Sequence, residues 1–329
     1  MAETNNTNAE RRVEPERRRV GILFLGGAKR VSMGQKFIDA GRRLGVDVEL
    51  YDYELTPYVP LASIGRVIVG RKWKDADLYE HLHACVEKYG ISIMVPFVDG
   101  AVEVAARYRD IYRDLFVPVG EPSGAAAMFD KIVADRIFRS NGLPVPRSDR
   151  FPMIAKPRCG SASKGIRIVH SPIELTSLEI STDRYLLQEY IVDRREITVD
   201  CYVAADGRII SAVPRYRLEV QGGEVSTTRV FADADVDALV RKTLRATGLR
   251  GAVTVQLLKD NATGRLLIME INPRLGGGAV ASVLAGADLP EMILRDAMKL
   301  PIEPVTKWND RLLVTRYFAE VGFNVDSEP

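Results

Sequence analysis

Hydrophobic and polar positions follow two different periodicities along the chain. Between Val20 and Gly120, apolar runs such as VGILFLGG, VDVELYD and ISIMVPFVD alternate with amphipathic stretches in which apolar residues recur at helical spacing. Helices are expected at residues 32–44 and 75–89. Because alternating strands and helices are typical of a parallel sheet covered on both faces, this region is predicted to be a Rossmann-like α/β unit.

Residues 121–148 predict a connector. The run GAAAMFDKIVADRIFRS favours one helix that ends at Asn141-Gly142, and the following GLPVPRS is an extended segment containing prolines. Beyond Phe151 the pattern changes to short strands with tight turns, including MIAKPR, GIRIVH and YLLQEYIV.

The remaining pattern predicts two hairpins and a short terminal region. Turns are expected at Ala205–Gly207 and at Asn261–Gly264, each between apolar runs. A helix over residues 289–299 and a last strand over residues 311–321 follow. We therefore expect a mixed or antiparallel architecture after the parallel unit.

Charge and cysteine content exclude several classes of function. The 46 basic and 44 acidic residues are interspersed and the net charge is +2, so no nucleic-acid-binding surface is indicated. Three cysteines without metal-type spacing fit a reducing cytoplasm. No apolar run reaches membrane-spanning length, and residues 1–19 have no apolar core of a signal peptide, so we expect a solvated tail and no membrane partner.

The stretch LLIMEINPRLGGG carries the first candidate chemistry. Glu270 and Asn272 are two apart on a predicted strand and therefore share a face. If the hairpin closes with Asp260 opposite Leu266, Gln256 lies across from Glu270, with Cβ atoms about 4.5–5.5 Å apart. Three oxygen donors then converge, a set that suits Mg²⁺ shared with phosphate oxygens. A polar hairpin edge whose groups satisfy one another is the structural alternative.

Two upstream segments indicate a nucleotide. IAKPRCGSASKGIRIV places Lys156 at a strand end before a loop of small residues, which lets backbone N–H groups approach a phosphate. The loop is not a Walker A motif, because Ile166 and Arg167 follow Gly165. In LLQEYIVDRREITVD, residues 188–192 form an extended segment that can pair with an adenine edge. In isolation, a structural glycine-serine turn explains the first segment better, and a solvated carboxylate at Glu196 beside Arg194 and Arg195 explains the second better.

In this order, the elements resemble the ATP-grasp superfamily and are most similar to its carbamoyl-phosphate-synthetase-like carboxylate-amine ligase branch. The resemblance covers about residues 20–320 and rests on Gln256 in one strand and on E-x-N-P-R in the next. It implies an α/β (α+β) fold with a Rossmann-like N-terminal subdomain, a small mixed-sheet lid and an antiparallel-sheet C-terminal subdomain. The implied boundaries are a tail at 1–19 and subdomains at 20–121, 122–192 (linker helix and lid) and 193–329.

Carried onto matching positions, the resemblance also implies roles for individual residues. ATP would contact Lys131 and Lys156, the lid loop with Ser161, Ser163 and Gly165, Glu189 and Ile191 at the adenine, and Glu196 at the ribose. Gln256, Glu270 and Asn272 would bind Mg²⁺, with Mn²⁺ as an alternative ion, and Arg274 would contact the reacting phosphate. The Asp130-Lys131 pair is also simply a favourable helix start.

Other segments offer further candidates. Arg215, Arg217 and Arg229 flank a Gly-Gly turn, and Arg217 is our choice for a substrate contact, with solvated strand-edge arginines as the alternative. FLGGAKR lacks G-x-G-x-x-G, so we interpret Asp52 on the second strand as structural and not as a ribose ligand. The three histidines are given no catalytic role.

The sequence therefore predicts an ATP-dependent carboxylate-amine ligase acting on small molecules. A carboxylate would be phosphorylated to an acyl phosphate, an amine would attack it, and ADP and phosphate would leave. An NAD(P)-dependent oxidoreductase built on the N-terminal sheet and a non-catalytic nucleotide-binding regulator are the alternatives. The motifs identify neither the acid nor the amine, and they are compatible with a homodimer.

Overall fold

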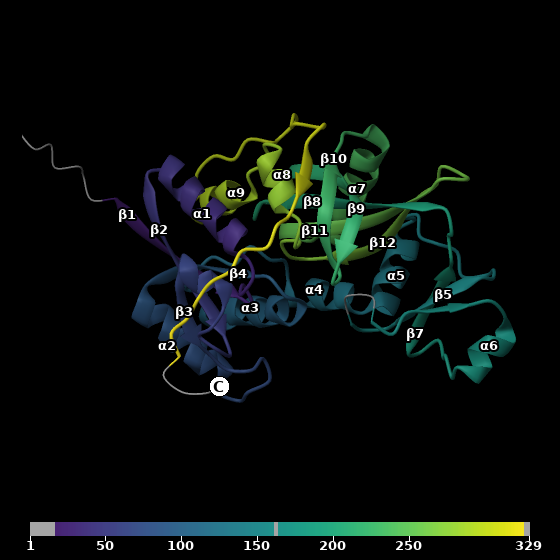
Figure 1. Cartoon of the computed structure of the whole chain (residues 1–329), viewed down its shortest axis with the longest axis horizontal. Coiled ribbons are helices and arrows are strands. Elements are labelled where there is room, and N and C mark those ends of the chain that lie inside the picture. The colour runs from purple at the N-terminus through teal and green to yellow at the C-terminus, as the bar shows by residue number, and fades with distance from the viewer. Residues whose placement is uncertain (1–16, 161–163, 326–329) are drawn as a thin grey trace, which may run out of the picture.

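The N-terminal region forms a four-stranded parallel sheet in the order β3-β2-β1-β4, in a computed structural model that describes residues 17–160 and 164–325 (Figure 1). This confirms the predicted parallel α/β unit, although β1 begins two residues before Val20 and residues 115–120 make isolated bridges at Phe116 and Val119. Its elements are β1 (Arg18–Leu25), α1 (Val31–Arg43), β2 (Val46–Glu54), η1 (Pro60–Ser63), β3 (Arg66–Val69), α2 (Leu78–Tyr89), β4 (Ile91–Pro96) and α3 (Asp99–Tyr112).

The connector contains two helices, α4 (Pro122–Phe129) and α5 (Lys131–Ser140), where the sequence pattern predicted one. The break falls at Asp130, whose backbone is extended (φ −93°, ψ 101°). Its carboxylate accepts hydrogen bonds from the backbone N–H groups of Ile132 and Val133, both at 3.1 Å, so it caps a new helix. The predicted helix end is correct, since Asn141 is the C-cap residue.

A small three-stranded sheet follows, in the order β6-β5-β7. Helix α6 packs against its strand β6. Its described strand pairs are all antiparallel, so the expectation of a mixed sheet is wrong. A core of its own, built on Ala155, Val169 and Ile180, stabilises it. The elements are β5 (Met153–Pro157), β6 (Arg167–Val169), α6 (Pro172–Ser177) and β7 (Tyr185–Glu189).

The largest sheet has the order β12-β11-β8-β9-β10-β13 and is antiparallel, as predicted. Both predicted turns are present, but the last strand is three residues long, where the sequence pattern predicted residues 311–321. The elements are β8 (Arg194–Val203), β9 (Ile209–Gln221), β10 (Glu224–Val230), α7 (Ala234–Thr247), β11 (Gly251–Asp260), β12 (Leu266–Asn272), α8 (Val280–Leu284), α9 (Leu289–Ala297) and β13 (Leu313–Thr315).

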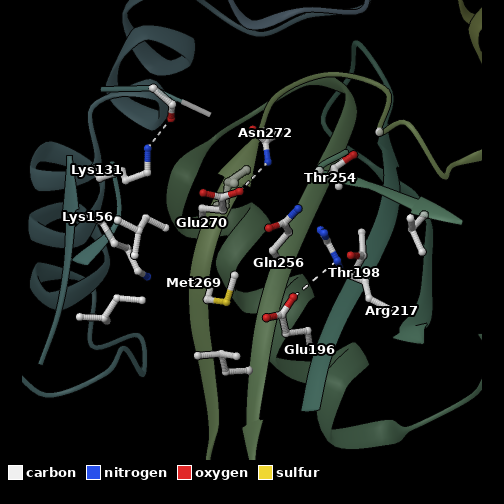
Figure 2. Close-up of a pocket in the computed structure, with 18 of the residues that line it drawn as sticks. Lys131, Lys156, Glu196, Thr198, Arg217, Thr254, Gln256, Met269, Glu270 and Asn272 are labelled. Carbon is white, nitrogen blue, oxygen red and sulfur yellow. Dashed lines mark hydrogen bonds and ion pairs between the residues drawn. The ribbon is translucent and has the colours of Figure 1, made fainter. Parts of the chain in front are cut away.

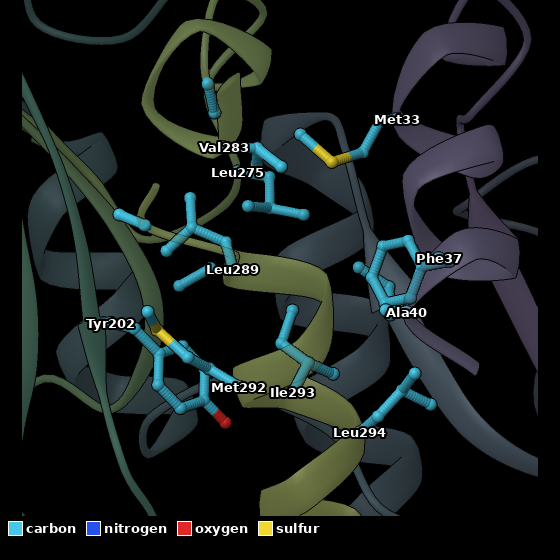
Figure 3. Close-up of a cluster of buried hydrophobic side chains, with 14 of the residues drawn as sticks. Met33, Phe37, Ala40, Tyr202, Leu275, Val283, Leu289, Met292, Ile293 and Leu294 are labelled. Atoms are coloured by element: carbon cyan, nitrogen blue, oxygen red, sulfur yellow. The ribbon is translucent and has the colours of Figure 1, made fainter. Parts of the chain in front are cut away.

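One hydrophobic core joins the parallel unit to the largest sheet. Helix α1 contributes Met33 and Phe37, and α9 presents Ile293 and Leu294 toward it (Figure 3). Tyr202 of β8 belongs to the same cluster of buried side chains. The small sheet, with its separate core, lies at the other end of the molecule in Figure 1 and faces the largest sheet across a cavity. No helix in residues 17–160 and 164–325 has the length and apolar character needed to span a membrane.

The segment after β13 returns to the parallel unit. Arg316 donates to Glu224 at 2.6 Å, and the Phe323 ring packs edge-on against Tyr58 with centroids 5.6 Å apart. Figure 1 shows this yellow segment running from β10 toward β3 and α2. The end of the described chain therefore bridges two sheets.

Candidate nucleotide and metal site

A cavity of about 760 Å³ lies between the small sheet and the largest sheet. It is polar on the side of β8, β9, β11 and β12, and Lys131 and Lys156 lie on the opposite side (Figure 2). Lys164 also lines it. Most of the predicted site residues line it, namely Lys131, Lys156, Glu189, Ile191, Glu196, Arg217, Gln256, Glu270, Asn272 and Arg274. Gly165 has a left-handed backbone (φ 73°) beside Pro157. Ser161 and Ser163 lie outside the described residues.

The hairpin of β11 and β12 brings the three proposed metal ligands together. Gln256 pairs with Glu270, as predicted, but the register near the turn differs from the prediction, because Lys259 and not Asp260 lies opposite Leu266. A bulge at Met269 corrects this one-residue slip. Met269 consequently lines the cavity alongside Glu270.

Hydrogen bonds connect the three candidate ligands to one another and to Arg217. Asn272 Nδ2 donates to Glu270 Oε1 at 3.3 Å. The Gln256 amide has two orientations related by a half-turn. In one, its nitrogen donates to Glu270 Oε1 at 2.8 Å and its oxygen accepts from Arg217 Nη1 at 3.3 Å. In the other, the amide oxygen faces Glu270, an arrangement that a cation between the two oxygens would stabilise.

The donor chemistry of this trio fits a hard divalent cation. One carboxylate and two carboxamides supply only oxygen ligands toward such an ion, and three ligands leave coordination positions for phosphate and water, as Mg²⁺ prefers. Within the described ranges no group of three or more His, Cys, Asp or Glu residues forms an alternative metal site.

Lys156 is a buried ammonium group held by a chain of polar side chains. Its Nζ donates to Gln188 Oε1 at 3.0 Å, and Gln188 Nε2 donates to Asp135 Oδ1 at 2.8 Å. Burial lowers the pKa of Lys156, and the nearby Glu270 carboxylate acts in the opposite direction. A buried cation with one neutral acceptor is ready to bind an anion, because an anionic partner would repay the free energy lost on desolvation.

Lys156→Met is expected to weaken binding of a non-hydrolysable Mg-ATP analogue by about 30-fold, the effect of losing one charge-assisted hydrogen bond of about 2 kcal/mol. The melting temperature of the nucleotide-free protein should stay the same or rise, since a desolvated charge is removed. Calorimetric titration measures the first effect and thermal unfolding the second. Lys242→Met, at an exposed position of α7, is the control. If both variants bound the analogue with equal affinity, the phosphate role of Lys156 would be withdrawn.

Lys131 and Glu189 make contacts that the motifs alone did not indicate. Lys131 Nζ donates to the carbonyl oxygen of Gly160 at 2.6 Å, which ties α5 to the loop after β5. The Glu189 side chain accepts from Arg265 Nη1 at 2.8 Å and from the Arg147 N–H at 2.9 Å. Burial pushes the pKa of Glu189 upward, but these hydrogen bonds outweigh it and lower the pKa. Only the backbone of Glu189 is therefore left to face a base.

A small apolar cluster beside Ile191 provides a surface for a planar ring. Leu258 and Leu267 are buried with Ile191, and Met269 packs against them. Ile191, Leu258 and Met269 line the cavity. The sequence analysis found Ile191 but missed the other members, since apolar residues in strands are indistinguishable from ordinary core positions.

Several charged side chains that line the cavity form ion pairs with one another or with a neighbouring element. Glu196 Oε2 lies 3.5 Å from Arg217 Nε, and Glu196 Oε1 lies 3.7 Å from Arg194 Nε. Arg274 Nε donates to Asp99 Oδ1 at 2.7 Å, which fixes the guanidinium from the N-terminal end of α3. Asp99 was not predicted, because 175 residues separate the two partners.

The three glycines after Leu275 let the chain pass unusually close to its neighbours. A Cβ atom at Gly276 would lie 2.9 Å from Thr254 Oγ1, and one at Gly277 would lie 3.2 Å from Arg30 Nη1. At Gly278 it would lie 2.5 Å from a methyl group of Val225. The three glycines thus allow this segment to pack closely against Thr254, Arg30 and Val225.

Asp52 has the structural role expected from the sequence. It is fully buried, and its Oδ1 accepts a hydrogen bond from the Gly27 N–H at 3.0 Å. Burial, together with the nearby Glu54, raises the pKa of Asp52 to about 8. It holds the turn between β1 and α1 and is not presented to a ribose. Arg229 is exposed on β10, where it pairs with Tyr216 of β9 and Leu313 of β13, in keeping with a solvated structural arginine.

Several known proteins resemble the chain. The D-alanine–D-alanine ligase of Xanthomonas axonopodis pv. citri is 25% identical over 301 residues, covering 78% of this chain and 85% of the relative. The methylcrotonoyl-CoA carboxylase alpha subunit of Glycine max is 26% identical over 224 residues, covering 56% of this chain but 30% of the relative. The chain therefore spans about a third of the length of such carboxylase subunits.

Solved structures share the fold at low identity. The N5-carboxyaminoimidazole ribonucleotide synthetase of Thermotoga maritima superposes with a TM-score of 0.66 at 18% identity, covering 88% of this chain and 78% of that one. The biotin carboxylase domain of the Hydrogenobacter thermophilus 2-oxoglutarate carboxylase, solved with MgADP, ADP and bicarbonate, gives 0.70 at 18% identity, covering 88% and 72%.

The fold, the site and these relatives agree with the resemblance of the chain to the ATP-grasp superfamily. Residues 181–318, somewhat less than half of the chain, match the family model described as ATP-grasp in the biosynthetic pathway with Ter operon.

Proposed function

We propose that the chain is an ATP- and Mg²⁺-dependent ligase that activates a small carboxylate as an acyl phosphate and joins it to an amine. The observation that carries the proposal is the placement of the Gln256, Glu270 and Asn272 oxygens across one cavity from Lys131 and Lys156. Oxygen ligands on one wall and ammonium groups on the other suit a triphosphate with its metal. The named activities of the ligase and synthetase relatives support the same class of reaction.

Different side chains of the site would bind different parts of the nucleotide. Lys131 and Lys156 would bind phosphate oxygens, and the apolar cluster at Ile191 would support the base. Bound Mg²⁺ would supply charge neutralisation at the transferred phosphoryl group. Arg274, fixed by Asp99, would stabilise the negative charge that builds up on that group.

The proposed reaction has two steps. A carboxylate oxygen attacks the terminal phosphorus, the bond to the ADP oxygen breaks, and ADP leaves with the electron pair. The amine then attacks the acyl carbon, loses a proton and displaces phosphate. The first step needs no general base, because the carboxylate is already an anion, and this agrees with the absence of any histidine among the described residues that line the cavity.

Product analysis tests this mechanism. With Mg-ATP and pooled small carboxylates and amines, ADP and phosphate are expected in equal amounts, without stoichiometric AMP. Hydroxylamine added in place of the amine should give a hydroxamate, which chromatography and mass spectrometry detect. Stoichiometric AMP and pyrophosphate would contradict phosphorylation of the carboxylate by the terminal phosphate, even if ligation were observed.

A further inference from the structure

Three buried polar atoms on β8 and β9 have no hydrogen-bond partner within the described part of the chain. They are Thr198 Oγ1, Arg215 Nη1 and Arg217 Nε, the last of which lies 3.5 Å from Glu196 Oε2 in an ion pair, and all three residues line the cavity. Among residues 17–160 and 164–325, the only other such atom is Asp52 Oδ2 on β2. Buried donors without partners are rare in folded proteins because each one costs free energy. Their concentration at one place indicates a missing ligand, and we call them the β8–β9 donor cluster.

The β8–β9 donor cluster adjoins the proposed metal ligands. Glu270 pairs with Gln256 across β12 and β11, Gln256 pairs with Thr198 on β8, and Thr198 pairs with Arg215 on β9. Directly paired residues of antiparallel strands share a face, so these side chains form one row across the sheet. Figure 2 shows Thr198 and Arg217 beside Gln256. A ligand at the cluster would therefore lie next to the metal and the phosphate.

Arg215 is held so that one nitrogen remains available. Its Nε donates to Asp200 Oδ2 at 2.8 Å and its Nη2 to Asp200 Oδ1 at 3.4 Å. Ser282 Oγ also donates to Asp200 Oδ2, at 2.7 Å. The Arg215 side chain is 3% exposed, and its Nη1 lies under Gly278, 2.8 Å from where a Cβ would stand. Fixed orientation and a remaining N–H donor are the properties of a residue that binds an anion.

The Gln256 amide links this cluster to the metal site. When the amide oxygen turns toward Glu270 to share a cation, the amide nitrogen turns toward Arg217 Nη1. Two donors then face each other, an arrangement that an acceptor hydrogen-bonded to both would stabilise. Binding of a cation on one side of Gln256 and of an anion on the other would thus favour the same amide orientation.

We propose that the β8–β9 donor cluster binds the substrate carboxylate that receives the phosphoryl group. The two oxygens of a carboxylate can accept hydrogen bonds from the separate donors of Thr198, Arg215 and Arg217, and the row of paired residues places the carboxylate beside the metal ligands. The inference rests on the proposed function and adds Thr198 and Arg215 to Arg217 as substrate contacts.

Thr198→Val tests the inference, because valine keeps the shape of threonine and removes only the hydroxyl group that lacks a partner. Acetate is the probe, titrated at constant ionic strength with and without MgADP and followed by calorimetry. The variant is expected to bind acetate about 10-fold more weakly than wild type, the effect of one hydrogen bond to a charged group. Its melting temperature without acetate should equal or exceed that of wild type. Unchanged acetate affinity in Thr198→Val, whatever its melting temperature, would overturn the inference.

Thr243→Val is the matched control. Thr243 is equally buried, but its hydroxyl donates to the carbonyl oxygen of Leu239 within α7, and Thr243 does not line the cavity. It should leave acetate affinity unchanged. A parallel titration with inorganic phosphate separates the two anions: phosphate binding without acetate binding would assign the cluster to a phosphoryl group and contradict the inference. If the wild-type protein does not bind MgADP, this result counts against the proposed function. If the wild-type protein binds MgADP but not acetate, the result counts against the carboxylate subsite alone.

Discussion

Glu270→Gln is expected to lower the rate of Mg-ATP turnover by about 1,000-fold or more, equivalent to about 4 kcal/mol of transition-state stabilisation. Glu270 is the only formally charged member of the proposed metal trio, and glutamine preserves its size. In the variant all three ligands, Gln256, Asn272 and the new glutamine, would be neutral amides. Three neutral ligands bind Mg²⁺ weakly, because no carboxylate charge is left. Steady-state ADP release across a Mg²⁺ titration measures the effect.

Glu219→Gln is the control for this change. Glu219 lies on β9, is exposed and accepts a hydrogen bond from Thr227 outside the cavity. It should retain wild-type turnover and thermal stability. If Glu270→Gln kept wild-type turnover with the same Mg²⁺ dependence, the metal assignment would be withdrawn.

Arg274→Lys should lower kcat by about 100-fold with little change in the KM for ATP, since an interaction made mainly in the transition state is lost. Lysine retains the charge but not the planar set of donors, so it cannot contact Asp99 and a phosphoryl oxygen together. Asp99→Asn, which weakens the orientation of Arg274, should show a smaller loss of about 10-fold.

Arg245→Lys, at an exposed position in the last turn of α7, serves as the matched arginine control. Initial-rate kinetics at several ATP concentrations separate kcat from KM. A rise in KM for ATP with normal kcat in Arg274→Lys would instead assign Arg274 to ground-state nucleotide binding.

Local patterns predicted the parts of the fold that depend on local periodicity. The parallel sheet and the antiparallel hairpins follow from apolar spacing and turn residues. The pairing of Gln256 with Glu270 was also predicted, although from a register that is wrong near the turn. The bulge at Met269 restores the pairing, and a bulge leaves little trace in alternation of apolar and polar residues.

Other features depend on contacts between distant segments. No sequence spacing links Asp99 to Arg274, or Arg30 to Glu224, whose atoms Nη2 and Oε1 are 2.9 Å apart. Arg217 was chosen over Arg215, yet two residues apart on β9 they share a face and both line the cavity. That spacing was the available signal. The helix break at Asp130 was similarly overlooked, because helix propensity continues through it while its capping hydrogen bonds do not appear in apolar periodicity.

The continuous apolar contact between α1 and α9 has a consequence for how the chain can be divided. A fragment ending near Gly120 would expose Phe37 and its neighbours to water, and the remaining piece would expose Ile293 and Leu294. The parallel unit and the largest sheet should therefore unfold together as one cooperative block. The small sheet, whose buried residues form a separate cluster, is free to open as an independent block of lower stability. The border between folding units thus falls on either side of residues 151–190, and not at the end of the Rossmann-like segment.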